Sequence, residues 1–329
     1  MTHRILLALS PLALTLAGCG AEAASVPALP PTPKGLEGKQ LNIPADNPMT
    51  AEKAHLGKML FFDKRLSKDG SMSCQSCHMH DKAWSDGIQF STKVDGSKNT
   101  RNSPSLYNVG YQQLYYWDGR APTMEKNVEA AWKGHMGGDP EAMAKTLAGI
   151  PGYVEAFQAS FHAAPTGTNI VQAITTFVRT LRSGDAPFDR GQQSEAAKRG
   201  HAVFMTRCAA CHVPPLFTDM LFHNVGVGAQ SDVGRFKVTE DPTTTGAFKT
   251  PSLRGAARSA PYFHDGSVPT LKEAVTIMAN AGVENEHLDP ILKGFKASLA
   301  APTAQEIDDL VEFVKSLDSS EPFEAPKLP

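Results

Sequence analysis

Two copies of a short cysteine motif constrain this chain more than any other feature of its sequence. The pattern Cys-x-x-Cys-His occurs at residues 74–78 and again at residues 208–212. Its members are Cys74, Cys77 and His78 in the first copy, and Cys208, Cys211 and His212 in the second. The copies lie too far apart for a short tandem repeat, so they predict two similar domains, each built around one motif.

The spacing within each motif has a chemical reason. Two thiols at this spacing can add to the two vinyl groups of one haem, and the following histidine then presents its imidazole to the iron. Disulfides, redox pairs and zinc sites are the alternatives for cysteine pairs. A redox pair does not require a following histidine, and beyond its own motif neither predicted domain has a cysteine to complete a zinc site. The motifs therefore predict two covalently attached c-type haems.

The composition is that of a soluble, packed protein. Hydrophobic residues make up 41% and charged residues 20% of the 329 residues, and the net charge is −2. A chain of this length suits two domains of ordinary size. The small net charge excludes the basic surface of a nucleic-acid-binding protein, so we expect no nucleic acid among its partners.

The first residues have the features of an export signal. A short basic start precedes an apolar run over residues 5–16, which ends in Ala-Gly-Cys at residues 17–19. This resembles a bacterial lipobox, which predicts a lipoprotein signal peptide at 1–18 and lipidation of Cys19; an ordinary secretory signal is the alternative. We expect a periplasmic protein that touches the membrane only through its lipid anchor. Gly20 after the cysteine favours the outer membrane.

Composition shifts divide the rest of the chain. Residues 19–48 are rich in Pro, Ala and Gly and predict a tether between the anchor and the folded body. We expect an N-terminal domain at 49–185 and a C-terminal domain at 190–320, with a hinge over 183–193. No strand alternation is visible. Helical periodicity predicts helices from about residue 50 and at 140–147, 153–161, 170–181, 194–205, 270–279 and 303–317. Long loops are expected at 67–123 and 213–269.

Several further motifs, in a fixed order over residues 50–318, resemble the bacterial di-haem cytochrome c peroxidases, a family that includes the MauG-type enzymes. Besides the second Cys-x-x-Cys-His, they are R-N-S-P-S-L-Y-N at 101–108, W-D-G-R at 117–120, F-K-T-P-S-L-R at 248–254 and P-Y-F-H-D-G at 261–266. The resemblance implies a mainly α fold of two cytochrome-c-like domains with long loops. Each domain surrounds one covalently attached haem, and a calcium ion lies between them.

The resemblance also assigns different roles to the two haems. The first haem, with His78 as its proximal ligand, reacts with peroxide. The second receives electrons and has the ligands His212 and Met278. Met278 stands where MauG-type members have Tyr, and a thioether ligand raises the haem potential, which suits an electron relay. Packing within a helix is the alternative role for Met278.

The remaining implied site residues lie between the haems. Trp117 matches the family's tryptophan at this position and either bridges electron transfer, packs the interface, or does both. The calcium ligands by position are Asn102, Ser259 and Pro261, through an amide side chain and backbone carbonyls. The family usually has Thr where Ser259 stands, which a backbone ligand tolerates.

The sequence departs from the family at two positions. Typical members carry a distal histidine that blocks the peroxide-reacting iron until the enzyme is reduced, and here that position is Val94. His80 lies on the proximal side and does not replace it. We therefore expect a first haem that meets peroxide without reductive activation.

The second departure concerns the catalytic acid–base group. The family has a Glu where this chain, in a stretch that is two residues shorter, has His135. An imidazole can take a proton from peroxide and return it to the leaving oxygen. Two other roles for His135 stay open: a ligand that closes the iron site, and a histidine on a surface loop.

Three functions follow from these assignments. The first is a peroxidase that reduces hydrogen peroxide to water with electrons from a small periplasmic cytochrome c or cupredoxin, with His135 and Trp117 as catalytic residues. The second is a MauG-like oxidase that modifies a partner protein. The third is a non-enzymatic di-haem electron carrier. A homodimer is possible, as family members commonly dimerise.

Overall fold

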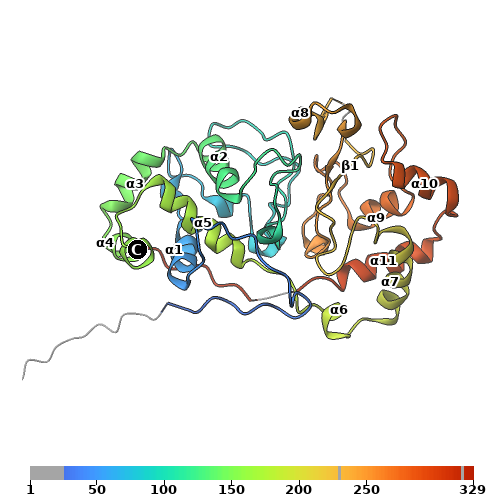
Figure 1. The fold of residues 1–329 in the computed structure, drawn as a ribbon, viewed down its shortest axis with the longest axis horizontal. Helices are drawn as coiled ribbons and strands as arrows, with labels where there is room; N and C mark the ends of the chain where they lie inside the picture. The colour runs from blue at the N-terminus through green and yellow to red at the C-terminus, as the bar shows by residue number, and fades with distance from the viewer. Residues whose placement is uncertain (1–25, 229–230, 320–321) are drawn as a thin grey trace, which may run out of the picture.

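The computed structural model describes residues 26–228, 231–319 and 322–329, and helices dominate it (Figure 1). The longer helices are α1 (Ala51–Phe62), α2 (Met124–Met136), α3 (Pro140–Ala148), α4 (Pro151–Phe161), α5 (Gly167–Thr180), α7 (Glu195–Arg207), α9 (Leu271–Ala279), α10 (Pro290–Ser298) and α11 (Ala304–Lys315). Two single-turn helices, α6 (Pro187–Arg190) and α8 (Phe236–Thr239), complete the set. The expected mainly α fold is confirmed. The expected signal peptide and Cys19 lie outside the described residues.

All seven expected helices are present, and their starts follow capping chemistry. The side chain of Thr50 accepts a hydrogen bond from the backbone N–H of Lys53 at the start of α1. Thr303 and Glu306 form a reciprocal capping box at the start of α11. These side chains satisfy N–H groups that have no partner within the helix. In the described parts of the loops at 67–123 and 213–269 there are only short helical turns, isolated bridges and one small sheet.

The structure adds α2, α10 and a pair of two-residue strands to the expected elements. Strand β1 (Phe222–His223) pairs antiparallel with β2 (Phe248–Lys249). Strands this short have no alternation to detect. Helix α2 buries Met124, Trp132 and Met136 and partly buries Val128. These four residues repeat every fourth position, a helical signal that stands out little among many charged neighbours.

The two domains repeat one helix crossing. In the N-terminal domain α1, which precedes the first cysteine motif, packs across α5; in the C-terminal domain α7, which precedes the second, packs across α11. A Cβ atom at Gly57 of α1 would lie 1.9 Å from the carbonyl oxygen of Ala173, and one at Gly200 of α7 would lie 1.9 Å from that of Asp309. Each crossing therefore requires a residue without a side chain.

Each domain has its own hydrophobic core. The N-terminal core includes Leu56, Leu60, Phe61, Trp84, Tyr153, Phe157 and Ile174. The C-terminal core includes Phe204, Phe217, Leu310, Phe313, Val314 and Leu317. In Figure 1 the helices α1 to α5 lie on one side of the molecule and α7, α9, α10 and α11 on the other, with long loops facing one another between them. The domain boundaries at 49–185 and 190–320 stay a prediction.

Segments near both ends of the described chain connect the domains. In the Pro-rich segment, Leu36 is buried against Tyr111 of the N-terminal domain and Leu216 of the C-terminal domain. After α11 the chain returns to the N-terminal domain, where Phe323 stacks on Phe62 and its end lies beside α4 (Figure 1). The expected tether thus contacts the folded body from Pro30 onward. Among the described residues, no helix is long and apolar enough to span a membrane.

Candidate functional site

One cavity of about 1690 Å³ lies between the domains and reaches both cysteine motifs. Its lining includes Cys74, Cys77, His78, Cys208, Cys211 and His212. Pockets for one drug-sized ligand typically measure about 300–1,000 Å³. The cavity is larger than that, as expected for a space that holds more than one large planar group.

The four cysteines of the motifs are free thiols in the structure. Burial raises the pKa of Cys74 and of Cys208 to about 12, so these thiols are protonated at neutral pH. Neither Cys-x-x-Cys pair forms a disulfide, although the predicted compartment is oxidising. Free, paired thiols that face a cavity fit the covalent attachment of haem.

The two motif histidines are held in the same way. His78 Nδ1 donates to the carbonyl oxygen of Trp84 (2.8 Å), and His212 Nδ1 donates to that of Phe217 (3.0 Å). Both carbonyls belong to residues in the left-handed backbone region, with φ of 60° at Trp84 and 54° at Phe217. A histidine held through Nδ1 keeps Nε2 for an iron ion. Burial lowers the pKa of both rings and favours the neutral form that binds metal.

The motifs at 101–108 and 248–254 support these carbonyls from equivalent positions. Ser105 Oγ donates to the carbonyl oxygen of Ala83, the residue before Trp84, at 2.6 Å. Ser252 Oγ donates to the carbonyl oxygen of Leu216, the residue before Phe217, also at 2.6 Å. The two Pro-Ser-Leu segments therefore stabilise equivalent backbone segments next to the motif histidines of the two domains. This confirms that the chain repeats one structural plan.

Trp117 lies where the domains exchange backbone hydrogen bonds. The N–H of Lys249 donates to the carbonyl oxygen of Trp117 (2.8 Å), and the N–H of Asn102 donates to that of His264 (2.7 Å). The indole Nε1 of Trp117 donates to the carbonyl oxygen of Asn102 (2.9 Å). Trp117 also lines the cavity. Its location at the boundary fits the position between haems that the sequence predicted.

A charged cluster closes the boundary next to Trp117. Arg101 donates to both carboxylate oxygens of Asp232 in the C-terminal domain (2.6 and 2.7 Å) and to Asp118 in its own (2.6 Å). Burial would raise the pKa of Asp118, but hydrogen bonds from Arg101 and Arg120 lower it below its ordinary value. Paired and largely buried charges of this kind depend on their geometry more than surface pairs do.

Met278 is placed on the same cavity as His212. It lies near the C-terminal end of α9 and packs against the buried residues Ala281, Leu288 and Leu292. Two of these, Leu288 and Leu292, come from α10 and the loop before it. The structure thus places the predicted axial methionine on the cavity that reaches the second haem-attachment motif, with α10 packed against it.

His135 lines the cavity together with His78. It lies on the last turn of α2, so it is not on a surface loop. Burial is the largest cause that lowers the pKa of His135, and the positive charges of Lys93 and Arg120 lower it further. The ring is therefore neutral at pH 7 and able to accept a proton.

The loop that carries the blocking histidine in typical relatives is a tight turn here. The N–H of Lys93 donates to the carbonyl oxygen of Ser97 (2.8 Å), and Gly96 adopts φ of 83°. The N–H of Val94 donates to the carbonyl oxygen of His135 (2.9 Å). Val94 is not among the described residues that line the cavity.

The three predicted calcium ligands belong to the same cavity. Asn102, Ser259 and Pro261 all line it. Asn102 is buried, and its amide nitrogen donates to the carbonyl oxygen of Ile88 (2.8 Å), which turns Oδ1 away from that bond. An amide oxygen and nearby carbonyls are suitable ligands for a hard cation.

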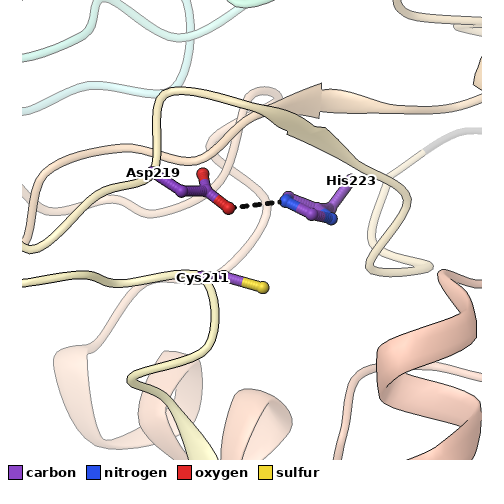
Figure 2. Close-up of side chains that lie close together, drawn as sticks. All are labelled: Cys211, Asp219 and His223. Carbon is purple, nitrogen blue, oxygen red and sulfur yellow. Dashed lines mark hydrogen bonds and ion pairs between the residues drawn. The ribbon is translucent and has the colours of Figure 1, made fainter.

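A second group of potential ligands lies beside the second motif. Potential ligand atoms of Cys211, Asp219 and His223 all lie within 4.8 Å of one another (Figure 2). His223 contacts Asp219 through Nε2 (2.9 Å) and Asp289 through Nδ1 (2.7 Å), so both ring nitrogens donate only if the ring is protonated. Hydrogen bonds to Asp219 and Cys211 are the largest causes that raise its pKa to about 11. Because Cys211 is needed for haem attachment, we assign this group to the surroundings of the second haem.

Two cytochrome-c-like domains with one shared cavity, two Cys-x-x-Cys-His motifs and two histidines held through Nδ1 define a di-haem protein of the cytochrome c class. A family model described as di-haem cytochrome c peroxidase matches residues 51–197, and a RoxA-like, cytochrome c-like model matches residues 247–278. The chain belongs to the di-haem cytochrome c peroxidase family, which includes MauG.

Similarity to individual relatives extends over nearly the whole chain. The chain is 38% identical to the methylamine utilization protein MauG of Methylophilus methylotrophus, covering 92% of this chain and 93% of that protein. It is 34% identical to the cytochrome-c peroxidase IdrP1 of Pseudomonas sp. (strain SCT), covering 92% and 88%. A solved MauG-like protein associated with microbial copper homeostasis superimposes with a TM-score of 0.74 at 31% identity, covering 91% and 96%.

Proposed function

We propose that this protein is a periplasmic di-haem peroxidase, which reduces hydrogen peroxide to water with electrons from a small cytochrome c or cupredoxin. Cys74, Cys77 and His78 hold the peroxide-reacting haem. Cys208, Cys211, His212 and Met278 hold the haem that receives electrons. The family match and the peroxidase relatives support this reaction.

The observation that carries the proposal is the set of residues that line the shared cavity. His78 and His135 line it, and so do His212, Met278 and Trp117. A haem bound at each motif supplies the electron-transfer chemistry that no amino-acid side chain has. The chain supplies the axial ligands, the proton carrier and the fixed geometry.

His135 is the proposed proton carrier. Reduction of one peroxide molecule to two waters consumes two electrons and two protons. As the O–O bond breaks, one peroxide oxygen must lose its proton while the other gains one, and a neutral imidazole can perform both steps in sequence. Burial and nearby positive charges lower the pKa of His135, so it is in the accepting form at neutral pH.

The route to the first haem is open in this proposal. Val94 stands where a blocking histidine would be, and its backbone is bound to His135 outside the cavity lining. No reductive activation is then required before peroxide binds. Trp117 carries electrons from the second haem site to the first.

The remaining parts of the site are structural. Asn102, Ser259 and Pro261 bind a calcium ion at the boundary, and the ion holds the two domains in register. Lipidation at Cys19 anchors the protein to the outer membrane and leaves the folded body in the periplasm.

Resting-state spectroscopy and rapid mixing test the proposal together. Ferric electron paramagnetic resonance should show one high-spin centre from the first haem and one low-spin centre from the second. When mixed with peroxide, the protein should oxidise a reduced small cytochrome c within its turnover time. Two low-spin centres, or no oxidation of the cytochrome, would contradict it.

A MauG-like oxidase is the second candidate, because MauG itself is 38% identical to this chain. Met278 argues against it, since MauG-type members have Tyr at this position. A Met278→Tyr variant separates the two functions. If the peroxidase proposal holds, this substitution should slow cytochrome oxidation sharply; an unchanged rate would favour the oxidase.

A further inference from the structure

Lys249 carries a buried ammonium group across the domain boundary. It lies on β2 of the C-terminal domain, and 8% of the residue is exposed. Its Nζ donates to Gln112 Oε1 (2.5 Å) and to the carbonyl oxygen of Leu114 (2.6 Å), both in the N-terminal domain. Its backbone N–H donates to the carbonyl oxygen of Trp117. One residue thus holds the segment 112–117 at three points.

The acceptors around this ammonium are neutral. Gln112 contributes an amide oxygen and Leu114 a backbone carbonyl, and the ring of Tyr115 lies 5.9 Å away. Burial lowers the pKa of Lys249 to about 7, with a smaller opposing effect from Asp118. A buried amine without a carboxylate in contact costs free energy. Stability alone therefore does not account for this arrangement.

The repeated structure of the chain shows what is special about Lys249. R-N-S-P-S-L at 101–106 and F-K-T-P-S-L at 248–253 are equivalent, so Asn102 is the counterpart of Lys249. Both use their backbone N–H to bind a loop carbonyl of the other domain, at His264 and Trp117. The side chain of Asn102 donates within its own domain, to Ile88. Of this pair, only Lys249 sends its side chain across the boundary, and it does so to the Trp117 loop.

Arg235 completes the hold on this loop. Its Nη1 donates to the carbonyl oxygens of Asp118 (2.9 Å) and Gly119 (3.1 Å), and its guanidinium group lies 4.4 Å from the ring centre of Phe222. Carbonyls on both sides of Trp117 therefore accept hydrogen bonds from the C-terminal domain. The indole itself is directed by its bond to Asn102.

We infer that Lys249 is a positioning residue for electron transfer between the two haem sites. It fixes the loop that carries Trp117 and so holds the indole in its transferring position. The inference rests on the proposed function of Trp117. In each transfer one electron leaves the second haem site, which is oxidised, and reduces the first; Lys249 itself exchanges no electron. Loss of this support loosens geometry on which the transfer rate depends.

The test compares variants of the haem-loaded protein in two measurements. The first is the rate at which peroxide oxidises the pre-reduced second haem, followed by its optical spectrum. The second is amide hydrogen exchange over residues 114–121, which reports the loop without reference to turnover. The variants are Lys249→Met, Lys249→Arg and Trp117→Phe. Lys272→Met, which breaks an exposed ion pair with Asp308, is the matched control.

We expect Lys249→Met to slow oxidation of the second haem by about tenfold or more and to speed exchange of the loop, while peroxide binding to the first haem is unchanged. Lys249→Arg, which keeps a cationic donor, should recover most of both properties. Lys272→Met should behave as wild type. If Lys249→Met does not assemble with haem, Lys249→Gln, which keeps a donor without the charge, replaces it, and its slowing should fall between those expected for Lys249→Met and Lys249→Arg.

Two outcomes overturn different statements. If Trp117→Phe is slow while Lys249→Met keeps wild-type transfer and exchange, the positioning role of Lys249 is wrong and the route through Trp117 stands. If Trp117→Phe transfers electrons at the wild-type rate, the route proposed for Trp117 fails, whatever Lys249 does to the loop.

Discussion

The backbone N–H of Val94 donates a hydrogen bond to the carbonyl oxygen of His135 at 2.9 Å. These are the two positions at which the sequence departs from the usual pattern of the family, and the structure joins them. The loop in which Val94 replaces the usual histidine is hydrogen-bonded to the end of α2, the helix that carries His135. We interpret the two departures as one remodelled side of the first haem site.

His135 should control the proton chemistry of peroxide reduction. Replacement of His135 by Ala should lower kcat/KM for peroxide by about 10²–10⁴-fold, because the proton carrier is lost. His135→Glu, which restores a carboxylate, should retain part of the activity. Steady-state peroxide consumption measures both. His287→Ala, at a largely exposed position outside the cavity lining, is the control, and equal losses in it and in His135→Ala would dismiss the assignment.

The pH profile of the same reaction should follow His135. Burial, with the charges of Lys93 and Arg120, lowers its pKa below the ordinary histidine value of about 6.5. The neutral ring is the active base, so activity should persist as pH falls to that value and decline only below it. A decline centred above neutral pH, or one that persists in His135→Glu, would assign the titration to another group.

The contact between the Val94 loop and the end of α2 should be disrupted by the addition of a single methyl group at Gly137. Gly137 ends α2 with φ of 62°, and a Cβ there would lie 3.1 Å from both Lys68 Cβ and Val94 Cγ1. Gly137→Ala should therefore destabilise the protein by about 1–2 kcal/mol, measured by thermal unfolding of the haem-loaded protein. Gly134→Ala lies within the same helix with open space around it and should be neutral or stabilising. Similar effects of the two substitutions would show that the contact between the Val94 loop and α2 does not contribute to stability.

The two helix crossings should be destabilised by the same kind of substitution. Gly57→Ala and Gly200→Ala each place a Cβ 1.9 Å from a backbone oxygen of the crossing helix. Each should cost about 3 kcal/mol of stability, because packed helices must separate. Gly294→Ala on α10, with no neighbour in range, is the matched control. Unfolding by a chemical denaturant, followed through the haem signal of each domain, reports the stability of the two domains separately. If Gly57→Ala left the stability of the N-terminal domain unchanged, the helix crossing described there would be contradicted.

Lys249 should make stability depend on pH in a defined window. Burial lowers its pKa to about 7 in the folded protein, whereas an unfolded lysine titrates near 10.4. Unfolding then takes up a proton between these values, so this residue makes the protein more stable as pH rises from about 7 to about 10. The unfolding free energy of wild type should therefore rise relative to that of Lys249→Met as the pH increases over this range. A difference that stays flat would mean that Lys249 has an ordinary pKa.

Much of the site was readable because its chemistry is local in sequence. The spacing of Cys74, Cys77 and His78 is a requirement of one haem, and it is complete within five residues. Helices such as α11 were predictable because a capping box marks the start of an apolar stripe. Helix α2 was missed, although Thr123 caps it and its apolar residues recur every fourth position.

The interdomain contacts were not predictable, because they join residues that are distant in the chain. Lys249 and Arg235 each look like one more surface cation in the sequence, and nothing local says which carbonyls they reach. His223 likewise has no neighbour in sequence that reveals Asp289 as its partner. The equivalence of 101–106 and 248–253 was a possible signal, because it pairs Asn102 with Lys249 and raises the question of why they differ.

The sequence by itself determined that the chain has two haem-attachment motifs, two similar helical domains and two departures at Val94 and His135, because covalent attachment and helix periodicity are encoded over a few residues. Only the tertiary structure decided that both motifs face one cavity, that His135 lines this cavity together with His78, and that the Trp117 loop is held from the other domain. Those relations depend on how two domains pack, and side-chain burial and distance exist only after they have packed.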